Sequence, residues 1–334
     1  MEWSFIVLLV HIAGRWEKAN PAKKMQLCLG IHVIMKIYKL PVDSILRPSH
    51  QEYLWPPANQ RSGWDYGVEQ DFEWWLDDRE DILVDDIEKA DWLYLPVYWN
   101  RYYINTPDKE GRWGGGVELL EECVHDALGY GIPTFTISEA DEKVLHSEIN
   151  WGSLLMFVAS RRGDIGIDIP LLSGRHDFPD DIPYKKWLAS FVGNLATDGI
   201  RIDMRTSLQR RNDCLIEHGE YGEEYFVNLM LESYIALCPR GTGGQSFRMY
   251  EAMQLGTVPM YISDMDCRPF KNWIDWDICS FWVNSTDKLN EYIGCLGAHT
   301  DKLLKMGELA KATFDDHLGY GKWCKFVIRE LELI

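Results

Sequence analysis

Short apolar runs, bounded by turn residues, alternate with longer amphipathic stretches over most of this chain. This alternation is typical of β-α units and predicts an α/β fold with mainly parallel sheets. The predicted strands fall into two series, first 35–38, 92–95, 134–137 and 154–158, and then 188–192, 234–237, 258–262 and 278–283. Two series of strands predict two α/β domains, which suits a length of 334 residues.

A polar segment rich in Pro and Asp, residues 174–186, separates the two series and is the predicted linker. We therefore expect an amino-terminal extension over 1–34, a first domain over 35–180 and a second domain over 187–334. From about Thr286 onward, apolar residues at helical spacing predict that the second domain ends in helices only.

The chain is strongly acidic, with 34 Lys and Arg, 52 Asp and Glu, and a formal net charge of −18. Binding to nucleic acid or to an anionic membrane needs a basic face, so neither partner is expected. A chain of this charge that binds a phosphorylated ligand must gather arginines and backbone N–H groups in one place.

The eight cysteines form no C-x-x-C pair and show no Cys/His spacing that suits zinc. We expect reduced, mostly buried thiols rather than a disulfide framework, because a chain of this length needs no covalent staples.

Two apolar runs near the amino terminus, 3–13 and 27–35, are both shorter than the about 20 residues that span a bilayer. Glu2 stands where a secretory signal has Lys or Arg. A soluble, cytoplasmic protein is therefore expected, and the alternative is the ER or Golgi lumen if the first run acts as a signal.

A glycine-rich loop follows the predicted strand at 234–237 and precedes a predicted helix that Ser246 opens and Gly256 closes. Ser is a preferred N-cap residue, and Gly is preferred just beyond a helix carboxyl end. The helix amino terminus would point its free N–H groups at the loop, whose glycines are Gly241, Gly243 and Gly244. Such an end attracts a phosphate.

Charged side chains flank this loop. Arg240 precedes it and Arg248 lies in the first turn of the helix, which places two permanent cations beside the phosphate site. Glu251 lies one turn further on, where its carboxylate can accept hydrogen bonds from ribose hydroxyls, although a surface ion pair with Arg248 is the alternative. Asp264 follows the next strand, at the sheet edge where open α/β sheets bind ligands.

The stretch from Cys238 to Asp264 resembles the donor-site signature of the exostosin family, glycosyltransferase family 47. The matching residues are Cys238-Pro-Arg-Gly241, Ser246-x-Arg248, Glu251-Ala252, Gly256-x-Val258-Pro259 and Ile262-Ser-Asp264. Weaker similarities lie at Glu88–Pro96, at Phe191–Asn194 with Ile200-Arg201, and at Lys36–Pro41. The family's usual amino-terminal membrane anchor has no counterpart in this sequence, so a Golgi location is not the first expectation.

The resemblance implies a GT-B architecture, in which two Rossmann-like domains face each other and the second holds a nucleotide sugar. It implies an inverting hexosyl- or pentosyltransferase that uses a UDP-sugar as co-substrate and a glycan as acceptor, with no cofactor. We expect four further residues to approach the diphosphate, namely Gly193, Asn194, Arg201 and Arg205. For the two arginines, a solvated helix face is the alternative.

The catalytic base is expected among carboxylates at strand ends of the first domain. Glu139 and Asp141 follow the strand predicted at 134–137, and Arg248 is expected to stabilise the departing diphosphate. For each acid, a helix N-cap or first-turn position is the alternative.

No metal site is expected. Asp264-Met-Asp266 and Asp275-Trp-Asp277 imitate the D-x-D motif of the other large glycosyltransferase fold, but GT-B enzymes place their donors without such a bridge. Trp99, Trp113 and Trp151 could stack on a sugar, and core packing is the alternative for them.

Two other functions stay open. The loop mimics a dinucleotide fingerprint, which would indicate a dehydrogenase. However, Ser246 occupies the position of the third glycine of that fingerprint, and binding of a nicotinamide cofactor does not require the two arginines. A non-catalytic module that binds a sugar or a sugar nucleotide would keep the glycine loop and lack the base.

Overall fold

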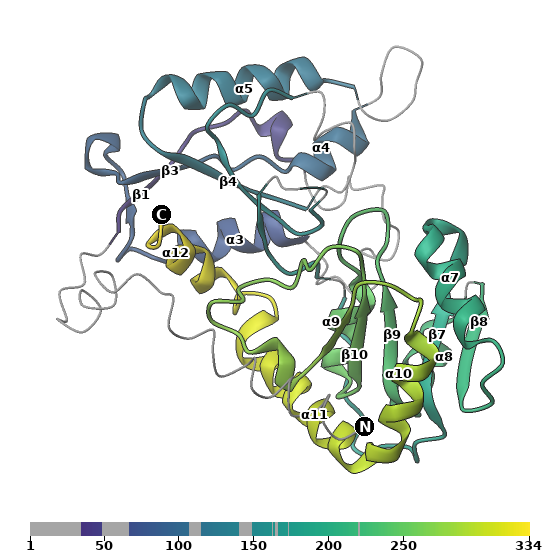
Figure 1. The fold of residues 1–334 in the computed structure, drawn as a ribbon. Coiled ribbons are helices and arrows are strands. Elements are labelled where there is room, and N and C mark those ends of the chain that lie inside the picture. The colour runs from purple at the N-terminus through teal and green to yellow at the C-terminus, as the bar shows by residue number, and fades with distance from the viewer. Residues whose placement is uncertain are drawn as a thin grey trace. The chain divides into compact units, whose positions relative to one another are not determined.

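The computed structural model describes residues 35–48, 67–106, 115–139, 149–161, 163, 166–172, 174–219 and 221–334. Residues 36–334 form one compact unit, and every element named below belongs to it. The described residues contain two separate parallel sheets with helices packed around them (Figure 1).

The first sheet has six parallel strands in the order β2-β1-β3-β4-β5-β6. Their bounds are β1 Ile37–Lys39, β2 Leu83–Val84, β3 Trp92–Tyr94, β4 Thr134–Ser138, β5 Leu155–Val158 and β6 Ile167–Asp168. The helices of this part are α3 Gly67–Asp77, α4 Trp99–Asn105 and α5 Val117–Gly129. Strand β4 is buried at every position, as expected for the interior of a parallel sheet.

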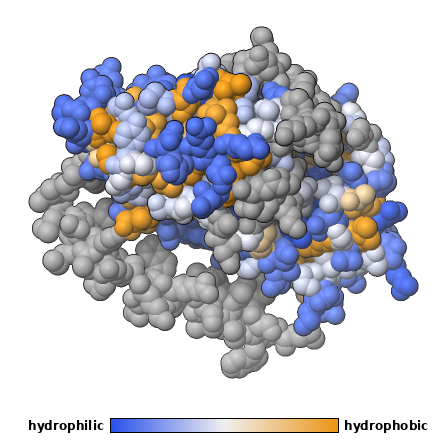
Figure 2. Space-filling view, turned by 90° about the horizontal axis from the view of Figure 1, so that it is seen from above, coloured by the Kyte–Doolittle hydropathy of each residue, from blue (hydrophilic) through white to orange (hydrophobic). Residues whose placement is uncertain are grey.

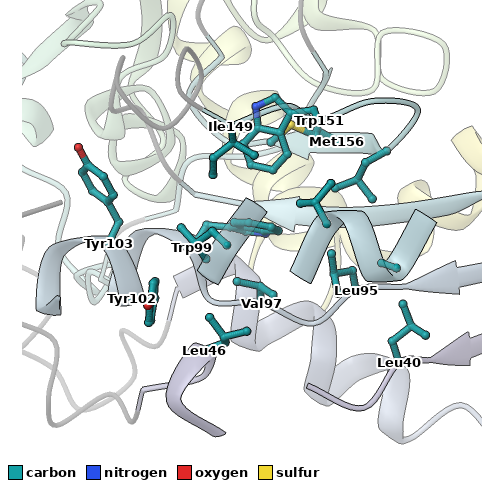
Figure 3. Close-up of a cluster of buried hydrophobic side chains, with 14 of the residues drawn as sticks. Leu40, Leu46, Leu95, Val97, Trp99, Tyr102, Tyr103, Ile149, Trp151 and Met156 are labelled. Carbon is teal, nitrogen blue, oxygen red and sulfur yellow. The ribbon is translucent and has the colours of Figure 1, made fainter. Parts of the chain in front are cut away.

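Two predicted sugar-stacking residues belong to the core of this first part (Figure 3). The Trp99 ring is fully buried and packs edge-on against Trp151, with their centroids 5.0 Å apart. Its indole N–H donates to the hydroxyl of Thr136 at 2.8 Å. Core packing is therefore the role of both rings, while Trp113 lies outside the described residues.

The second sheet has five parallel strands in the order β11-β10-β9-β7-β8. Their bounds are β7 Trp187–Gly193, β8 Cys214–His218, β9 Ser233–Pro239, β10 Val258–Ile262 and β11 Phe281–Val283. The helices are α7 Gly199–Leu208, α8 Glu223–Leu231, α9 Phe247–Gln254, α10 Leu289–Leu296, α11 Thr300–Thr313 and α12 Cys324–Leu331. Its core side chains, among them Leu237 and Met260, come from these strands and from α7, α10 and α11.

The last helix, α12, returns to the first sheet and lies beside α3 (Figure 1). The carboxylate of Asp71 accepts hydrogen bonds from the Trp323 indole at 2.7 Å and from the Gly321 amide at 2.8 Å. Burial raises the pKa of Asp71, and these hydrogen bonds act in the opposite direction. This contact connects the carboxyl-terminal end of the chain to the part that folds around β1–β6.

The predicted α/β class with two parallel sheets is confirmed, and these are the sheets that a GT-B architecture requires. All eight predicted strands exist, and from residue 286 onward the described elements are helices. Strands β2, β6 and β8 were not predicted. The limits of the two domains stay a prediction.

Two further properties concern the described residues only. Seven cysteines there are free and four of them are buried, which agrees with the expected thiols. No helix in the described part of the chain is long and apolar enough to cross a membrane. On the face shown in Figure 2, hydrophobic residues lie among hydrophilic ones.

Candidate functional site

The glycine loop joins β9 to α9, as predicted. Ser246 takes the N-cap position with extended backbone angles, φ −142° and ψ 128°, although its side chain makes no capping hydrogen bond. Gly256 follows the helix with φ +62°, the left-handed conformation that favours glycine at a helix end. The amino end of α9 therefore lies at the loop, where the Met249 amide donates to the Ser246 carbonyl at 3.0 Å and the Ser246 side chain bonds none of the first N–H groups.

Gly243 and Gly244 pack closely against the segment that follows β5 of the first sheet. A Cβ atom on Gly243 would lie 2.1 Å from Oγ of Ser160, and one on Gly244 would lie 2.8 Å from the carbonyl oxygen of Arg161. The amide of Gly244 donates to that same carbonyl at 2.9 Å. Close approach of two backbone segments thus requires glycine at both positions.

Arg201 lies in the first turn of α7 and reaches the start of the glycine loop. Its Nε donates to the carbonyl of Arg240 at 3.0 Å, and its Nη1 donates to the carbonyl of Asn194 at 2.8 Å. Burial lowers the pKa of Arg201 to about 10, and the positive charges of Arg248 and Arg240 act in the same direction. These three side chains, Arg201, Arg240 and Arg248, are called the arginine cluster below.

Arg248 is the most enclosed member of the arginine cluster. Its guanidinium packs over the rings of Phe191 and Phe226, 4.2 and 5.4 Å from their centroids, and donates to the carbonyl of Val192. A Cβ atom on Gly193 would lie 2.8 Å from its Nη2, so glycine at that position leaves room for the guanidinium. The Nε atom is buried and has no hydrogen-bond partner among the described residues. Burial lowers the pKa of Arg248, and the negative charge of Glu251 acts in the opposite direction.

Arg240 is held by two aspartates. Its Nη1 lies 2.8 Å from Asp198, which also caps α7, and its Nε lies 2.7 Å from Asp264. Asp264 therefore contacts the arginine cluster from the end of β10. By contrast, Arg205 is exposed in the last turn of α7, and the side chain of Asn194 accepts a hydrogen bond from the Ala196 amide at 2.8 Å.

Glu251 is 16% exposed, and its ion pair in the described structure is made with the linker rather than with Arg248. Nε2 of His176 lies 3.5 Å from its carboxylate, and Nδ1 of the same ring lies 3.2 Å from Glu223 of α8. The His176 side chain is only 8% exposed. Sequence patterns gave no sign of this residue, because it lies in a segment without periodicity.

Glu139 forms a buried pair with a second acid, Glu69, in the first turn of α3. The Glu139 amide donates to the Glu69 carboxyl group at 3.0 Å, and the residues are 7% and 3% exposed. Burial and then the charge of Glu139 raise the pKa of Glu69 to about 8. At neutral pH Glu69 therefore holds a proton.

A continuous line of contacts joins this acid pair to the glycine loop. Glu139 follows Ser138, the last residue of β4, whose carbonyl accepts a hydrogen bond from the Ala159 amide at 2.9 Å. The next residue, Ser160, packs on Gly243. The end of β4, directly before Glu139 of the acid pair, and the glycine loop after β9 thus both contact the segment that follows β5. The other predicted base, Asp141, lies outside the described residues.

The aspartates of the two D-x-D stretches are engaged by basic side chains and a helix start. Asp266 pairs with Arg268 at 2.9 Å and with Lys271 at 3.2 Å. Asp277 lies 3.4 Å from Arg268, and Asp275 caps the short helix at 276–278.

Comparison with known families identifies the part of the chain that carries the glycine loop. Residues 145–292 match the family model of the Exostosin GT47 domain. Over these residues the chain is similar to the exostosin GT47 family. The matched stretch contains the arginine cluster, His176 and Glu251, while Glu69 and Glu139 precede it in the sequence.

Three curated relatives have the same family name. Exostosin-1 homolog of Caenorhabditis elegans is 27% identical over 157 residues, which cover 40% of this chain and 41% of the relative. Exostosin-1 of Drosophila melanogaster is 28% identical over 123 residues, or 30% of this chain and 16% of the relative. Exostosin-1b of Danio rerio is 24% identical over 206 residues, or 52% and 28%. The chain thus matches less than half of the length of each relative.

Similar solved structures include TarM, with a TM-score of 0.40 and 10% identity over 72% of this chain and 53% of that chain. Another is Anabaena Alr3699/HepE in complex with UDP-glucose, with a TM-score of 0.40 and 11% identity over 90% of this chain and 100% of that chain. Because both TM-scores are low, the fold described above rests on the strand order of this chain itself.

Proposed function

We propose that this chain is a glycosyltransferase that moves a sugar from a UDP-sugar to a hydroxyl group of a glycan acceptor, with inversion at the anomeric carbon. The observation that carries the proposal is the arginine cluster at the amino end of α9, in a chain with a net charge of −18. The positive charges of Arg248 and Arg240 act to lower the pKa of Arg201, and a bound anion would offset that repulsion. The match to the Exostosin GT47 domain over residues 145–292 supports this proposal.

The diphosphate of the donor is proposed to bind to the arginine cluster and to the backbone N–H groups of Phe247 and Arg248 at the start of α9. The buried Nε of Arg248, which has no partner among the described residues, is a donor available for a phosphate oxygen. Glu251 lies one turn further along α9 and is proposed to accept hydrogen bonds from the ribose hydroxyls.

Glu139 is proposed as the base, and Asp141 is the second candidate. The acceptor oxygen attacks the anomeric carbon, its proton passes to the carboxylate, and the bond from that carbon to the diphosphate oxygen breaks. The proton on Glu69 reduces the negative charge beside Glu139 at neutral pH.

Donor placement is proposed to need no metal ion. The positive charge that stabilises the departing diphosphate would come from Arg201, Arg240 and Arg248, which are fixed in place before the reaction and need no reorganisation during it.

The direct test is release of UDP by the full chain from a panel of UDP-sugars, with and without oligosaccharide acceptors. We expect acceptor-dependent release for at least one donor, and we expect it to persist in the presence of a chelator. Binding of a UDP-sugar without release under any condition would contradict the proposal and indicate a binding module.

A further inference from the structure

His176 lies between two carboxylates that come from two helices of the second sheet. The ring nitrogens lie 3.2 Å from Glu223 of α8 and 3.5 Å from Glu251 of α9. The ring also packs against Phe226, with centroids 6.0 Å apart, and Phe226 in turn contacts Arg248. The backbone amide of His176 donates to the side chain of Gln254 at 2.9 Å, which fixes this part of the linker on α9.

Two carboxylates beside the two ring nitrogens favour a protonated ring. Neither ring nitrogen meets hydrogen-bond geometry with its carboxylate, so the contacts at 3.2 and 3.5 Å are ion pairs. A neutral imidazole carries no charge for such pairs, whereas an imidazolium attracts both carboxylates. Burial works to lower the pKa of His176, but Glu251 and Glu223 outweigh that effect, so the pKa is raised. Arg248 also acts on Glu251, the carboxylate on the Nε2 side of the ring.

We propose that His176 is a positioning residue for the donor site, in which its imidazolium fixes the Glu251 carboxylate and offsets its negative charge. This inference rests on the proposed function. One oxygen of Glu251 faces His176, which leaves the second oxygen for the ribose. A nucleotide sugar also brings an anionic diphosphate close to Glu251, and the imidazolium reduces the repulsion between the two.

The sign of the pH dependence follows from the raised pKa. Donor binding involves the folded protein, so the imidazolium acts until the pH rises through the folded-state pKa of His176, which lies above the usual value of about 6.5. Donor affinity should therefore fall as the pH rises through that higher value. Removal of Glu223 removes one of the two groups that raise the pKa, so it should move this fall to lower pH.

The test is the dissociation constant of UDP-glucose, a probe whose diphosphate does not titrate in this range, measured by calorimetry from about pH 6 to about pH 8.5. For the unmodified chain we expect about a tenfold rise in Kd over the range. His176→Gln should bind about tenfold more weakly at the lowest pH and show no further dependence, with kcat at saturating donor little changed.

Two substitutions on α8 make the test specific. Glu223→Gln changes an exposed residue and should leave binding at about pH 6 unchanged while moving the midpoint to lower pH. Glu224→Gln removes the same charge from the next residue, about 100° around the helix, and should match the unmodified chain. Identical pH profiles for all four proteins would overturn the role of His176 alone, whereas failure of the unmodified chain to bind any UDP-sugar would overturn the proposed function with it.

Discussion

Ser160 occupies the space where a side chain on Gly243 would lie, because its Oγ is 2.1 Å from the position that a Cβ atom would take there. The two residues follow strands of different sheets, β5 and β9. Their contact therefore fixes the glycine loop against the end of the first sheet, on the side where Glu139 follows β4.

Gly243→Ala should displace the loop or the 159–161 segment, because a backbone oxygen as well as the Ser160 hydroxyl blocks the new methyl group. We expect a loss of about 1–3 kcal/mol in the free energy of unfolding, measured with urea, and weaker binding of UDP. Gly199→Ala is the matched control, since nothing lies within 4 Å of a Cβ there. Equal effects of the two substitutions would show that the close contact is unimportant.

Arg248→Ala should lower turnover by about 10²-fold or more, on the order of 3 kcal/mol of lost charge stabilisation at the departing diphosphate. The measurement is kcat for UDP release in the presence of acceptor. Arg205→Ala removes an exposed arginine from α7 and should change kcat less than about twofold. Full activity of Arg248→Ala would contradict the site.

Glu139→Gln should remove the proposed base while it keeps the size of the side chain and one acceptor oxygen. We expect kcat to fall by about 10²- to 10⁴-fold with the Kd for the donor nearly unchanged. If kcat is retained, the base must be sought elsewhere, first at Asp141.

Glu69 gives a prediction for stability as a function of pH. Because its folded-state pKa is raised to about 8, the folded protein binds this proton more tightly than the unfolded chain does. Stability should therefore fall as the pH rises from about 4.5 to about 8, by about 1.4 kcal/mol for each pH unit from this group. Glu69→Gln should lose that slope in urea unfolding, and an unchanged slope would mean that Glu69 is ionised in the folded protein.

Much of the fold could be predicted from local patterns. The apolar run at 258–262 has the same bounds as β10, because that strand is buried at every position and flanked by turn residues. Strand β8 was missed because it is only half-buried and ends in Glu217 and His218, which weaken its apolar pattern. Strands β2 and β6 have two residues each, too few for any periodic signal.

Only those site residues that lie close together in the sequence could be predicted. Arg240, Arg248 and Glu251 stand within one strand-loop-helix unit, so helix spacing placed them together. The partners of two acids were missed because folding brings them from distant parts of the chain. Glu69 lies 70 residues before Glu139, and His176 lies in a segment without periodicity. Close packing at Gly243 was also hidden, because a sequence does not show which backbone approaches a glycine.

A crystal structure of the full chain with bound UDP would show whether the nucleotide lies at the amino end of α9. We expect phosphate oxygens within about 3.2 Å of the Arg248 guanidinium, and ribose hydroxyls within the same distance of the Glu251 carboxylate. UDP bound away from both residues, or no bound UDP at saturating concentration, would contradict the proposed donor site.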